Sequence, residues 1–524
     1  MHSLFLITEL VEHIVASMAK VERPDPDNLC HCLIQSLTPD AAKDIRSLGL
    51  TARLFRDPTL DALWRVQSSL APLFRSVGAV GPPQTPIIER ESWTLRRFLN
   101  TDDVPILLQY SSRISALALS NLSPLFPDYL PLLRSLPPTI LFPRLSRICC
   151  RESGIAEASF VLARMGNSLT SAHMLSKTVI PAGIVSQLRH SPAILRFVQL
   201  ESAVGGALQD GELTSSEIQN LLRETTSLLN LFLWANANEA MWYAASRLPL
   251  KLLLFRASEL RPFSSVENTT FQMLTFLRLD IPGFSFLLKI FSKVSFPALR
   301  TFLCFFEEYR RGSHAEAAAL FAAIDRVCPN ATLTELWIER TEYTEDTEHP
   351  TDYFIRPDAL RPLLRCKNMR SLLLRLEWNW DLDDALMQDM AQAWPDLREL
   401  VLDVETPSWP TVPRITFRGL VALAFGCPHL KHFGAGLDTT PLSPSYRTEL
   451  AQESAATRRV NTNLWDLRIG YSTIREEHVE DIAVFLEDLC SQLRLYGANY
   501  DDKWPRVNMR IRDLRGGRES QIQK

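Results

Sequence analysis

The chain has 524 residues, of which 46% are apolar and 22% are charged, and this composition excludes the disordered and fibrous classes. A chain of this length exceeds what one compact core supports, so it must divide into domains or grow along one axis as repeats. The net charge of −4 gives no reason to expect nucleic acid as a partner, because dedicated nucleic-acid binders carry a basic domain or stripe.

The nine cysteines are odd in number and show no framework spacing, which predicts reduced thiols in the cytosol or nucleus. The opening MHSLFLITEL lacks the basic start of a signal peptide, and its apolar run is broken by Glu9. No stretch approaches 18 uninterrupted apolar residues, so we expect no membrane span. These features together predict a soluble protein of the cytoplasm or nucleus that has no membrane partner.

Residues 1–75 are predicted to form helices. Apolar side chains recur there at helical spacing in three groups: Leu6, Leu10, Ile14 and Met18, then Ile45, Leu48, Leu54 and Phe55, then Leu60, Leu63 and Trp64. Pro58 is expected to stop or restart the helix after the second group, and a polar stretch from Lys20 to Asp40 separates the first two groups. Gly81, Pro82, Pro83 and Pro86 then indicate a linker or cap over residues 76–110.

Residues 111–500 repeat one unit, in which a segment of form L-x-x-L-x-L follows a stretch with helical spacing. The clearest copies are LRFVQL (195–200), LTFLRL (274–279), LRTFLC (299–304), LTELWI (333–338), MRSLLL (369–374), LRELVL (397–402), LKHFGA (430–435) and LWDLRI (464–469). Weaker copies are ISALAL (114–119), LSRICC (145–150), LTSAHM (169–174) and LPLKLLL (248–254). A strand plus helix cannot bury its apolar face alone, so stacked units are expected to share a core. We therefore predict an α/β fold: a leucine-rich-repeat-like solenoid with a curved parallel sheet, preceded by an all-α module.

The N-terminal residues resemble an F-box, the helical motif that binds a Skp-type adaptor in cullin-based ubiquitin ligases. The resemblance lies in LITELVEHI (6–14) and in IRSLGLTARLFRDPTLDALWR (45–65), with Ile7 in place of the family's proline and a longer gap before Ile45. The whole chain is similar to F-box proteins with degenerate leucine-rich repeats from mushroom-forming fungi, through segments such as LFPRLSR (141–147), AQAWPDLREL (391–400) and FGCPHLKHF (425–433).

This resemblance implies a substrate-receptor subunit of a Skp–cullin–F-box ubiquitin ligase, without catalytic activity of its own. The side chains expected to bind the adaptor are Leu6, Leu10, Ile14, Leu60, Leu63 and Trp64. The same side chains could instead fill a small three-helix core. A short segment with many large apolar residues and little to bury them against favours a partner.

Substrate is expected on the concave face of the repeats. In an L-x-x-L-x-L strand the leucines point into the core, and the third and fifth residues point to the concave side. This rule selects Glu335, Trp337, Glu399, Val401, His432, Gly434, Asp466 and Arg468, and Trp378 and Trp380 are expected at the rim of the sheet. Of these, the candidates for substrate binding are Glu335, Trp337, Trp378, Trp380, Glu399, His432, Asp466 and Arg468.

Other motifs favour neither a metal nor a cofactor. Cys30-His31-Cys32 is one tight triplet, whereas structural zinc needs four ligands in two spaced pairs, so a loop is the better interpretation. The chain lacks phosphate-loop, dinucleotide-binding, nucleophile-elbow and zinc-protease motifs. Glu339 to Glu348 is expected to be a solvated loop, and residues 501–524, with an excess of basic residues, a frayed tail.

Two other functions remain open at this point. The chain could be a protein-interaction scaffold that binds no adaptor, or a hydrolase or transferase whose site is assembled from distant residues.

Overall fold

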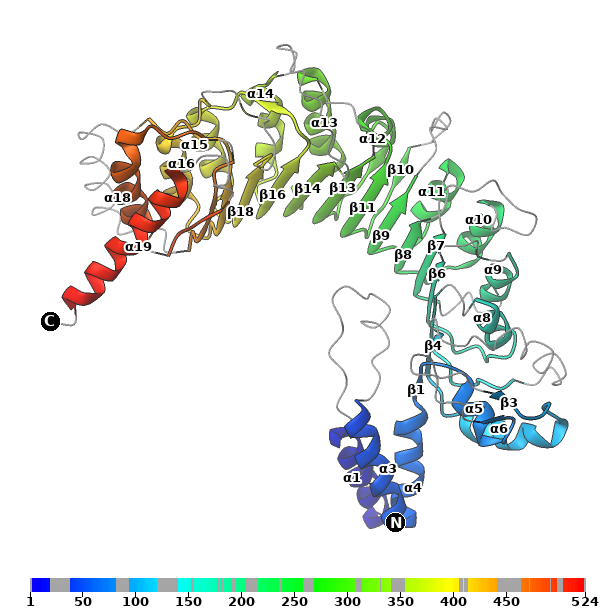
Figure 1. Ribbon diagram of the computed structural model, residues 1–524. Helices are drawn as coiled ribbons and strands as arrows, with labels where there is room; N and C mark the ends of the chain where they lie inside the picture. Colours follow the sequence, from blue (N-terminus) through cyan, green and yellow to red (C-terminus); the bar gives the residue numbers. More distant parts are fainter. Residues whose placement is uncertain are drawn as a thin grey trace. The chain divides into compact units, whose positions relative to one another are not determined.

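The computed structural model describes most of the chain in separate segments (Figure 1). These are residues 2–18, 38–81, 94–119, 140–151, 155–176, 180, 182–189, 195–202, 215–234, 238–257, 268–307, 313–329, 331–340, 354–404, 409, 413–440, 463–470, 472–490, 492–496 and 503–522. The chain separates into two compact units, residues 1–250 and residues 251–524. Cys30, His31 and Cys32 lie outside the described residues, and so do residues 341–348 of the predicted acidic loop. The first two residues of that predicted loop, Glu339 and Arg340, belong to a strand instead.

The first unit begins with helices and continues as alternating strands and helices. Its elements are α1 (His2–Met18), α3 (Pro39–Thr51), α4 (Arg53–Trp64), β1 (Val66–Gln67), α5 (Ala71–Ser76), β2 (Val80–Gly81), β3 (Thr94–Leu95), η1 (Thr101–Asp103), α6 (Val104–Ser111), β4 (Ala116–Leu119), β5 (Arg147–Arg151), α8 (Ile155–Leu162), β6 (Ser171–Ser176), α9 (Ala182–Leu188), β7 (Phe197–Ser202), α10 (Ser215–Glu224), β8 (Asn230–Trp234) and α11 (Glu239–Ser246).

Helices α1, α3 and α4 form a small helical module. Its interior contains Val11 and Val15 from α1 and Ile45 from α3, each no more than 4% exposed. The Thr38 hydroxyl accepts a hydrogen bond from Ala41 N at the start of α3, so the side chain serves as an N-cap. Gly49 lets α3 approach α4 closely, because a Cβ at this position would lie 2.3 Å from Thr59 Oγ1.

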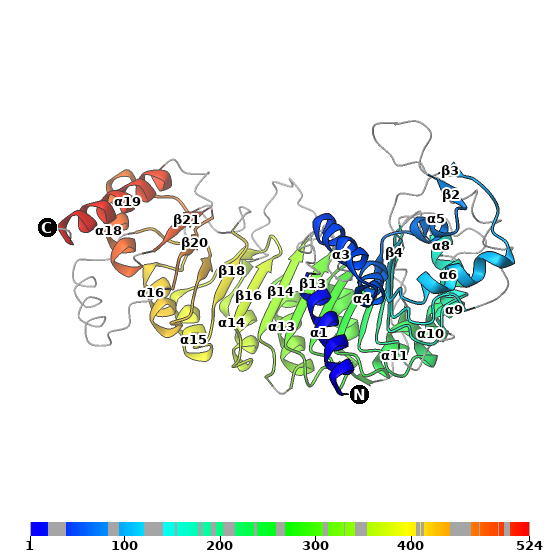
Figure 2. The ribbon, with the colours of Figure 1, turned by 90° about the horizontal axis from the view of Figure 1, so that it is seen from below.

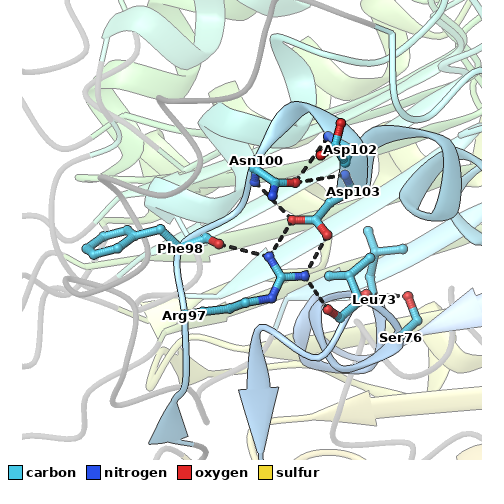
Figure 3. A network of polar contacts seen from close by, with 8 residues as sticks. Leu73, Ser76, Arg97, Phe98, Asn100, Asp102 and Asp103 are labelled. Carbon is cyan, nitrogen blue, oxygen red and sulfur yellow. Dashed lines mark hydrogen bonds and ion pairs between the residues drawn. The ribbon is translucent and has the colours of Figure 1, made fainter.

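The segment between this module and the repeats is held by a buried carboxylate. Asp103, at the start of α6, receives Arg97 Nη1 at 2.8 Å and Nη2 at 2.6 Å (Figure 3). Asn100 N donates to the same carboxylate, and the Asn100 side chain caps η1 in return. Arg97 also donates to the carbonyl of Val77, so the ion pair ties α5 to α6.

In the first unit the strands β1, β4, β5, β6, β7 and β8 pair in that order, and each pair is parallel. Helices α8, α9 and α10 connect successive strands from β5 to β8, α11 follows β8, and these helices lie along one side of the sheet (Figure 1). Parallel strands need such crossover connections, which bury the helix-facing side of each strand.

The second unit repeats the same alternation. Its elements are β9 (Leu252–Arg256), β10 (Thr269–Thr270), β11 (Phe276–Ile281), α12 (Phe284–Phe291), β12 (Val294–Ser295), β13 (Thr301–Phe306), α13 (His314–Val327), β14 (Glu335–Arg340), β15 (Phe354–Ile355), α14 (Pro357–Leu360), η4 (Arg361–Arg365), β16 (Ser371–Arg375), β17 (Asn379–Trp380), α15 (Asp384–Ala393), β18 (Glu399–Leu402), α16 (Phe417–Gly426), β19 (His432–Gly434), β20 (Asp466–Arg468), η5 (Glu476–His478), α18 (Val479–Leu489), β21 (Arg494–Tyr496) and α19 (Lys503–Ile522).

The strands of its main sheet pair in the order β9, β11, β13, β14, β16, β18, β19, β20 and β21, and all these pairs are parallel. Helices α12 to α16 lie along one side of the strands, as both ribbon views show (Figures 1 and 2). In β14 the burial alternates, so that Leu336, Ile338 and Arg340 are buried and Glu335 and Trp337 are exposed. We call the side of this sheet that the helices leave uncovered the open face.

The structure confirms the expected α/β class with parallel strands separated by helices. Each of the twelve segments quoted above contains a strand, and in the clear copies the strand starts two residues after the first leucine or methionine of the motif. Three strands of the main sheets were not predicted: β1, which lies in the segment predicted to be all-helical, β8, which starts inside the unrecognised copy LLNLFL (228–233), and β21. The short paired strands β2, β3, β10, β12, β15 and β17 were not predicted either. Among the described residues, no helix is long and apolar enough to cross a bilayer.

The C-terminal segment corrects one expectation. Residues 503–522, predicted to be a frayed tail, form helix α19, which packs against α18. Trp504, Val507 and Ile511 recur on one face of α19 and are each 0% exposed. At the surface, Arg506 pairs with Glu476 of η5 and Arg510 pairs with Glu480 of α18, so part of the basic charge of α19 has a counter-charge within the second unit.

We predict that Trp504→Ala destabilises the second unit by about 3–5 kcal/mol, because a large buried side chain is lost and its N–H no longer reaches the carbonyl of Ser472 at 2.6 Å. Urea unfolding followed by circular dichroism measures this loss. Met509→Ala is the matched control, since Met509 lies on the same helix and is 59% exposed. Equal stability of the two variants would show that α19 is not part of the folded unit.

Candidate interaction surfaces

The helical module presents large apolar side chains to solvent. Leu10 of α1 is 59% exposed, Leu50 near the end of α3 is 84% exposed, and Leu54 at the start of α4 is 50% exposed. Monomeric proteins bury most leucines, so three exposed leucines on one small module indicate a surface for a partner.

The residues predicted to bind an adaptor divide into three groups. Leu10 is exposed as expected, whereas Ile14, Leu60, Leu63 and Trp64 are half-buried, and Leu6 lies in α1 with its side chain outside the described residues. Trp64 packs its ring against Tyr110 of α6, with 4.7 Å between the ring centroids. This tryptophan therefore joins the module to the rest of the first unit and is only partly available to a partner.

Sequence reasoning missed Leu50 as a site residue and assigned Leu54 to an apolar helix face. The two leucines lie on either side of Ala52, which is the C-cap of α3 and the N-cap of α4. Because the chain leaves the helical conformation at Ala52, the apolar spacing of α3 does not continue into α4. A spacing rule for one continuous helix could not reveal which of these side chains point outward.

Helix α4 is fixed directly to the repeats that follow. Arg113 donates to the carboxylates of Asp57 at 2.8 Å and Asp61 at 2.5 Å, and Arg65 O accepts from Ala116 N at 3.0 Å. The module is thus joined to the sheet of the first unit through side-chain and backbone bonds.

On the side of the first unit's sheet that the helices leave uncovered, small side chains and hydrogen-bonded side chains pack closely together. Ala116 and Cys149 form a buried cluster there, with Val66, Ala118 and Leu175 packed against it. His173 is 1% exposed, stacks on Phe197 with ring centroids 4.0 Å apart, and bonds Ser171 Oγ through Nε2 and Gln199 Oε1 through Nδ1. Burial lowers the pKa of His173 to about 4, although the bond to Gln199 opposes that shift.

The open face of the second unit consists of registered rows. One row runs through Thr301, Glu335, Ser371, Glu399, His432 and Asp466, and the next runs through Leu303, Trp337, Leu373, Val401, Gly434 and Arg468. Since neighbouring strands lie about 4.8 Å apart, residues of one row are side by side.

Trp337 is the exposed aromatic residue at the centre of these rows, with 36% of the residue accessible. Its Nε1 donates to Glu339 at 2.8 Å, and its ring lies 6.1 Å from that of Phe305. The guanidinium of Arg278 lies 4.3 Å from the centre of the Phe305 ring and pairs with Asp280. This chain of contacts across β11, β13 and β14 holds the indole in place before any partner arrives.

The structure puts most of the predicted substrate-binding residues on this face. Glu335 is exposed, and Glu399, His432 and Arg468 are half-buried. Asp466 belongs to the same row but is 3% exposed, because His432 and Arg468 both reach its Oδ2. Val401 and Gly434 are also buried, with Val401 packed against Leu373 and Val404. The row that contains Trp337 is therefore buried at β18 and β19, and the accessible part of the open face centres on β14.

Trp378 and Trp380 were predicted at the rim, and this is wrong. They are 1% and 0% exposed and belong to an aromatic cluster with Phe284 and Phe321. The cause is Asp403, a buried carboxylate that accepts hydrogen bonds from the backbone N–H groups of residues 376 to 378 and from Trp380 Nε1 at 2.8 Å. These four bonds fold the segment after β16 inward over the core.

No family model matches the chain, and none of the curated proteins searched is similar to it. Among the described residues no three His, Cys, Asp or Glu side chains gather in a way that could hold a metal ion. Two surfaces of the protein are candidates for binding partners: the exposed leucines of the helical module and the rows around Trp337.

We predict that the first unit loses stability as the pH falls from about 6.5 to about 4. His173 is neutral when folded and has a lower pKa than in the unfolded chain, so the unfolded state binds the proton in this range. The full effect is about 3 kcal/mol at the acid end. His173→Gln should have a shallower dependence on pH in urea unfolding measured across this range. Identical slopes for the two proteins would contradict the prediction.

Proposed function

We propose that this protein is the substrate-receptor subunit of a Skp–cullin–F-box ubiquitin ligase. The observation that carries the proposal is the exposure of Leu10, Leu50 and Leu54 on a three-helix module that precedes a set of stacked strand–helix repeats. The F-box resemblance of residues 6–14 and 45–65 covers the same helices.

The adaptor would cover the exposed leucines. Complete burial of an exposed leucine contributes about 1.5–3 kcal/mol. The three leucines, which are between 50% and 84% exposed, can therefore supply a substantial part of the energy of such a contact. Helix faces that carry such side chains commonly bind in the apolar groove of a partner. Leu63 and Trp64 would contribute with the parts of their side chains that remain accessible beside Tyr110.

The substrate would bind to the open face around Trp337. An exposed tryptophan that neighbouring side chains already hold in one orientation loses little entropy on binding, and such residues dominate the energy of many interfaces. In this arrangement the receptor raises the effective concentration of substrate lysines near the ubiquitin-carrying enzyme, and the chemistry belongs to its partners.

The first test concerns the adaptor. Leu50→Glu with Leu54→Glu should reduce binding to a purified Skp-type adaptor by at least about a hundredfold, because two charges would be buried in an apolar contact. Isothermal titration calorimetry on full-length protein measures the affinity. Both side chains are exposed, so the fold should keep its thermal midpoint.

The matched control is Met273→Glu with Met509→Glu, which adds the same two charges at exposed apolar sites of the second unit. It should bind the adaptor as the unchanged protein does. If the unchanged protein itself does not bind the adaptor, the chain is better explained as an interaction scaffold built on repeats.

The second test concerns the substrate. Trp337→Ala with Arg468→Ala should remove at least one partner from the proteins that co-purify with the full-length chain, while adaptor binding stays unchanged. Quantitative mass spectrometry compares this variant with Phe98→Ala, which removes an exposed aromatic side chain from the first unit. The same set of partners for both variants would exclude the open face as the substrate site.

A further inference from the structure

A line of cations lies at the end of the second unit's sheet where the strands begin. The residue directly before each strand is placed by backbone bonds to its neighbours: Arg370 N donates to Thr334 O at 2.7 Å, Arg398 N to Arg370 O at 2.7 Å, and Lys431 N to Arg398 O at 2.8 Å. The same position is occupied by Arg300 before β13. These positions succeed one another at the strand spacing of about 4.8 Å, with the uncharged Thr334 before β14 between Arg300 and Arg370.

The turns that lead into β13, β14, β16, β18 and β19 are residues 297–300, 331–334, 367–370, 395–398 and 428–431. They hold five Lys or Arg residues (Arg300, Lys367, Arg370, Arg398 and Lys431) and one carboxylate, Asp396. All five cations are exposed. We call this line of five residues the basic edge.

The cations of the basic edge have no salt bridge and no side-chain hydrogen bond within the part of the chain that the structure describes. Several arginines on the helix side of the same unit are paired instead, with Arg361 at 2.8 Å from Asp389 and Arg365 at 2.9 Å from Asp325. Exposed cations on neighbouring strands that form no ion pair of their own are available to a partner that carries negative charge.

We propose that the basic edge binds an acidic segment of a protein partner, which lies across the strand starts from β13 to β19. From Arg300 to Lys431 the line covers four strand steps, or about 19 Å. An extended segment of about six residues has this length. The flexible Lys and Arg side chains can adjust to carboxylates that repeat at the spacing of an extended chain.

Two observations favour a protein segment over nucleic acid. The five turns carry no Phe, Tyr or Trp on which unpaired bases could stack. Glu335 and Glu399 follow directly after the edge in β14 and β18, and a continuous phosphate backbone lying over these strands would be repelled by them. A peptide can place acidic residues on the edge and neutral or basic residues beyond it.

This proposal does not depend on adaptor binding, and its test uses full-length protein. The probe is a fluorescent peptide of about ten glutamates, and anisotropy is read at a low salt concentration of about 50 mM. Arg370→Glu with Arg398→Glu and Lys431→Glu should weaken binding at least about tenfold. Raising the salt several-fold should weaken binding of the unchanged protein and have little effect on this variant.

The matched control is Lys289→Glu with Lys293→Glu and Arg512→Glu, three exposed cations of the same unit whose reversal changes the net charge equally. It should keep at least about half of the affinity, whereas equal loss in both triple variants would overturn the proposal. A Gln triple at residues 370, 398 and 431 should show an intermediate loss and the unchanged thermal midpoint.

Two further probes decide the class of partner. Stronger binding of oligo-thymidylate than of the glutamate peptide would overturn the proposal in favour of nucleic acid. Stronger binding to vesicles of phosphatidylcholine with about one third phosphatidylserine would overturn it in favour of a membrane surface.

Discussion

The backbone ladder between strand starts is the constraint on which the rest of this protein depends. Arg300 O accepts hydrogen bonds from both Thr334 N and Glu335 N. In the same way Thr334 O accepts two hydrogen bonds from the start of β16, and Arg370 O accepts two from the start of β18. Because each new strand is fixed at its first residue, equal positions of successive motifs fall into one row. The two rows of the open face around Trp337, the basic edge and the rows of core leucines all follow from this one ladder.

The strands could be predicted from the sequence because the L-x-x-L-x-L motif shows which side chains of a strand face the core. It also shows which positions of neighbouring strands pair with each other. The leucines at the first position are almost completely buried: Leu274, Leu333 and Leu397 are each 0% exposed. The wrong placement of Trp378 and Trp380 has a definite cause. No motif in the sequence connects them to Asp403, whose carboxylate draws them inward from the next repeat. Helix α19 was hidden in a similar way, since its basic composition resembles a solvated tail while its acidic partners lie 30 residues earlier.

The candidate surfaces were predictable only in part. Alternation in the strand correctly placed Glu335 and Trp337 on the accessible side, because side chains of a strand alternate wherever it lies in a sheet. For helices the spacing gives a face but not what covers it. Val11 and Leu10 are neighbours in α1, yet the first is 4% exposed and the second 59% exposed. Only the packing of α3 and α4 decides between them, and this packing depends on close approaches such as that of Gly49 to Thr59.

The connections between strands differ in length while the ladder does not. Glu335 and Thr301 are 34 residues apart, Ser371 and Glu399 are 28 apart, and each pair still lies directly opposite in neighbouring strands. Growth or loss of residues in a connection therefore leaves the register of both neighbours intact. Such a chain can acquire new loops beside a recognition surface during evolution, and a peptide tag or fluorescent reporter could be inserted there without displacing a row.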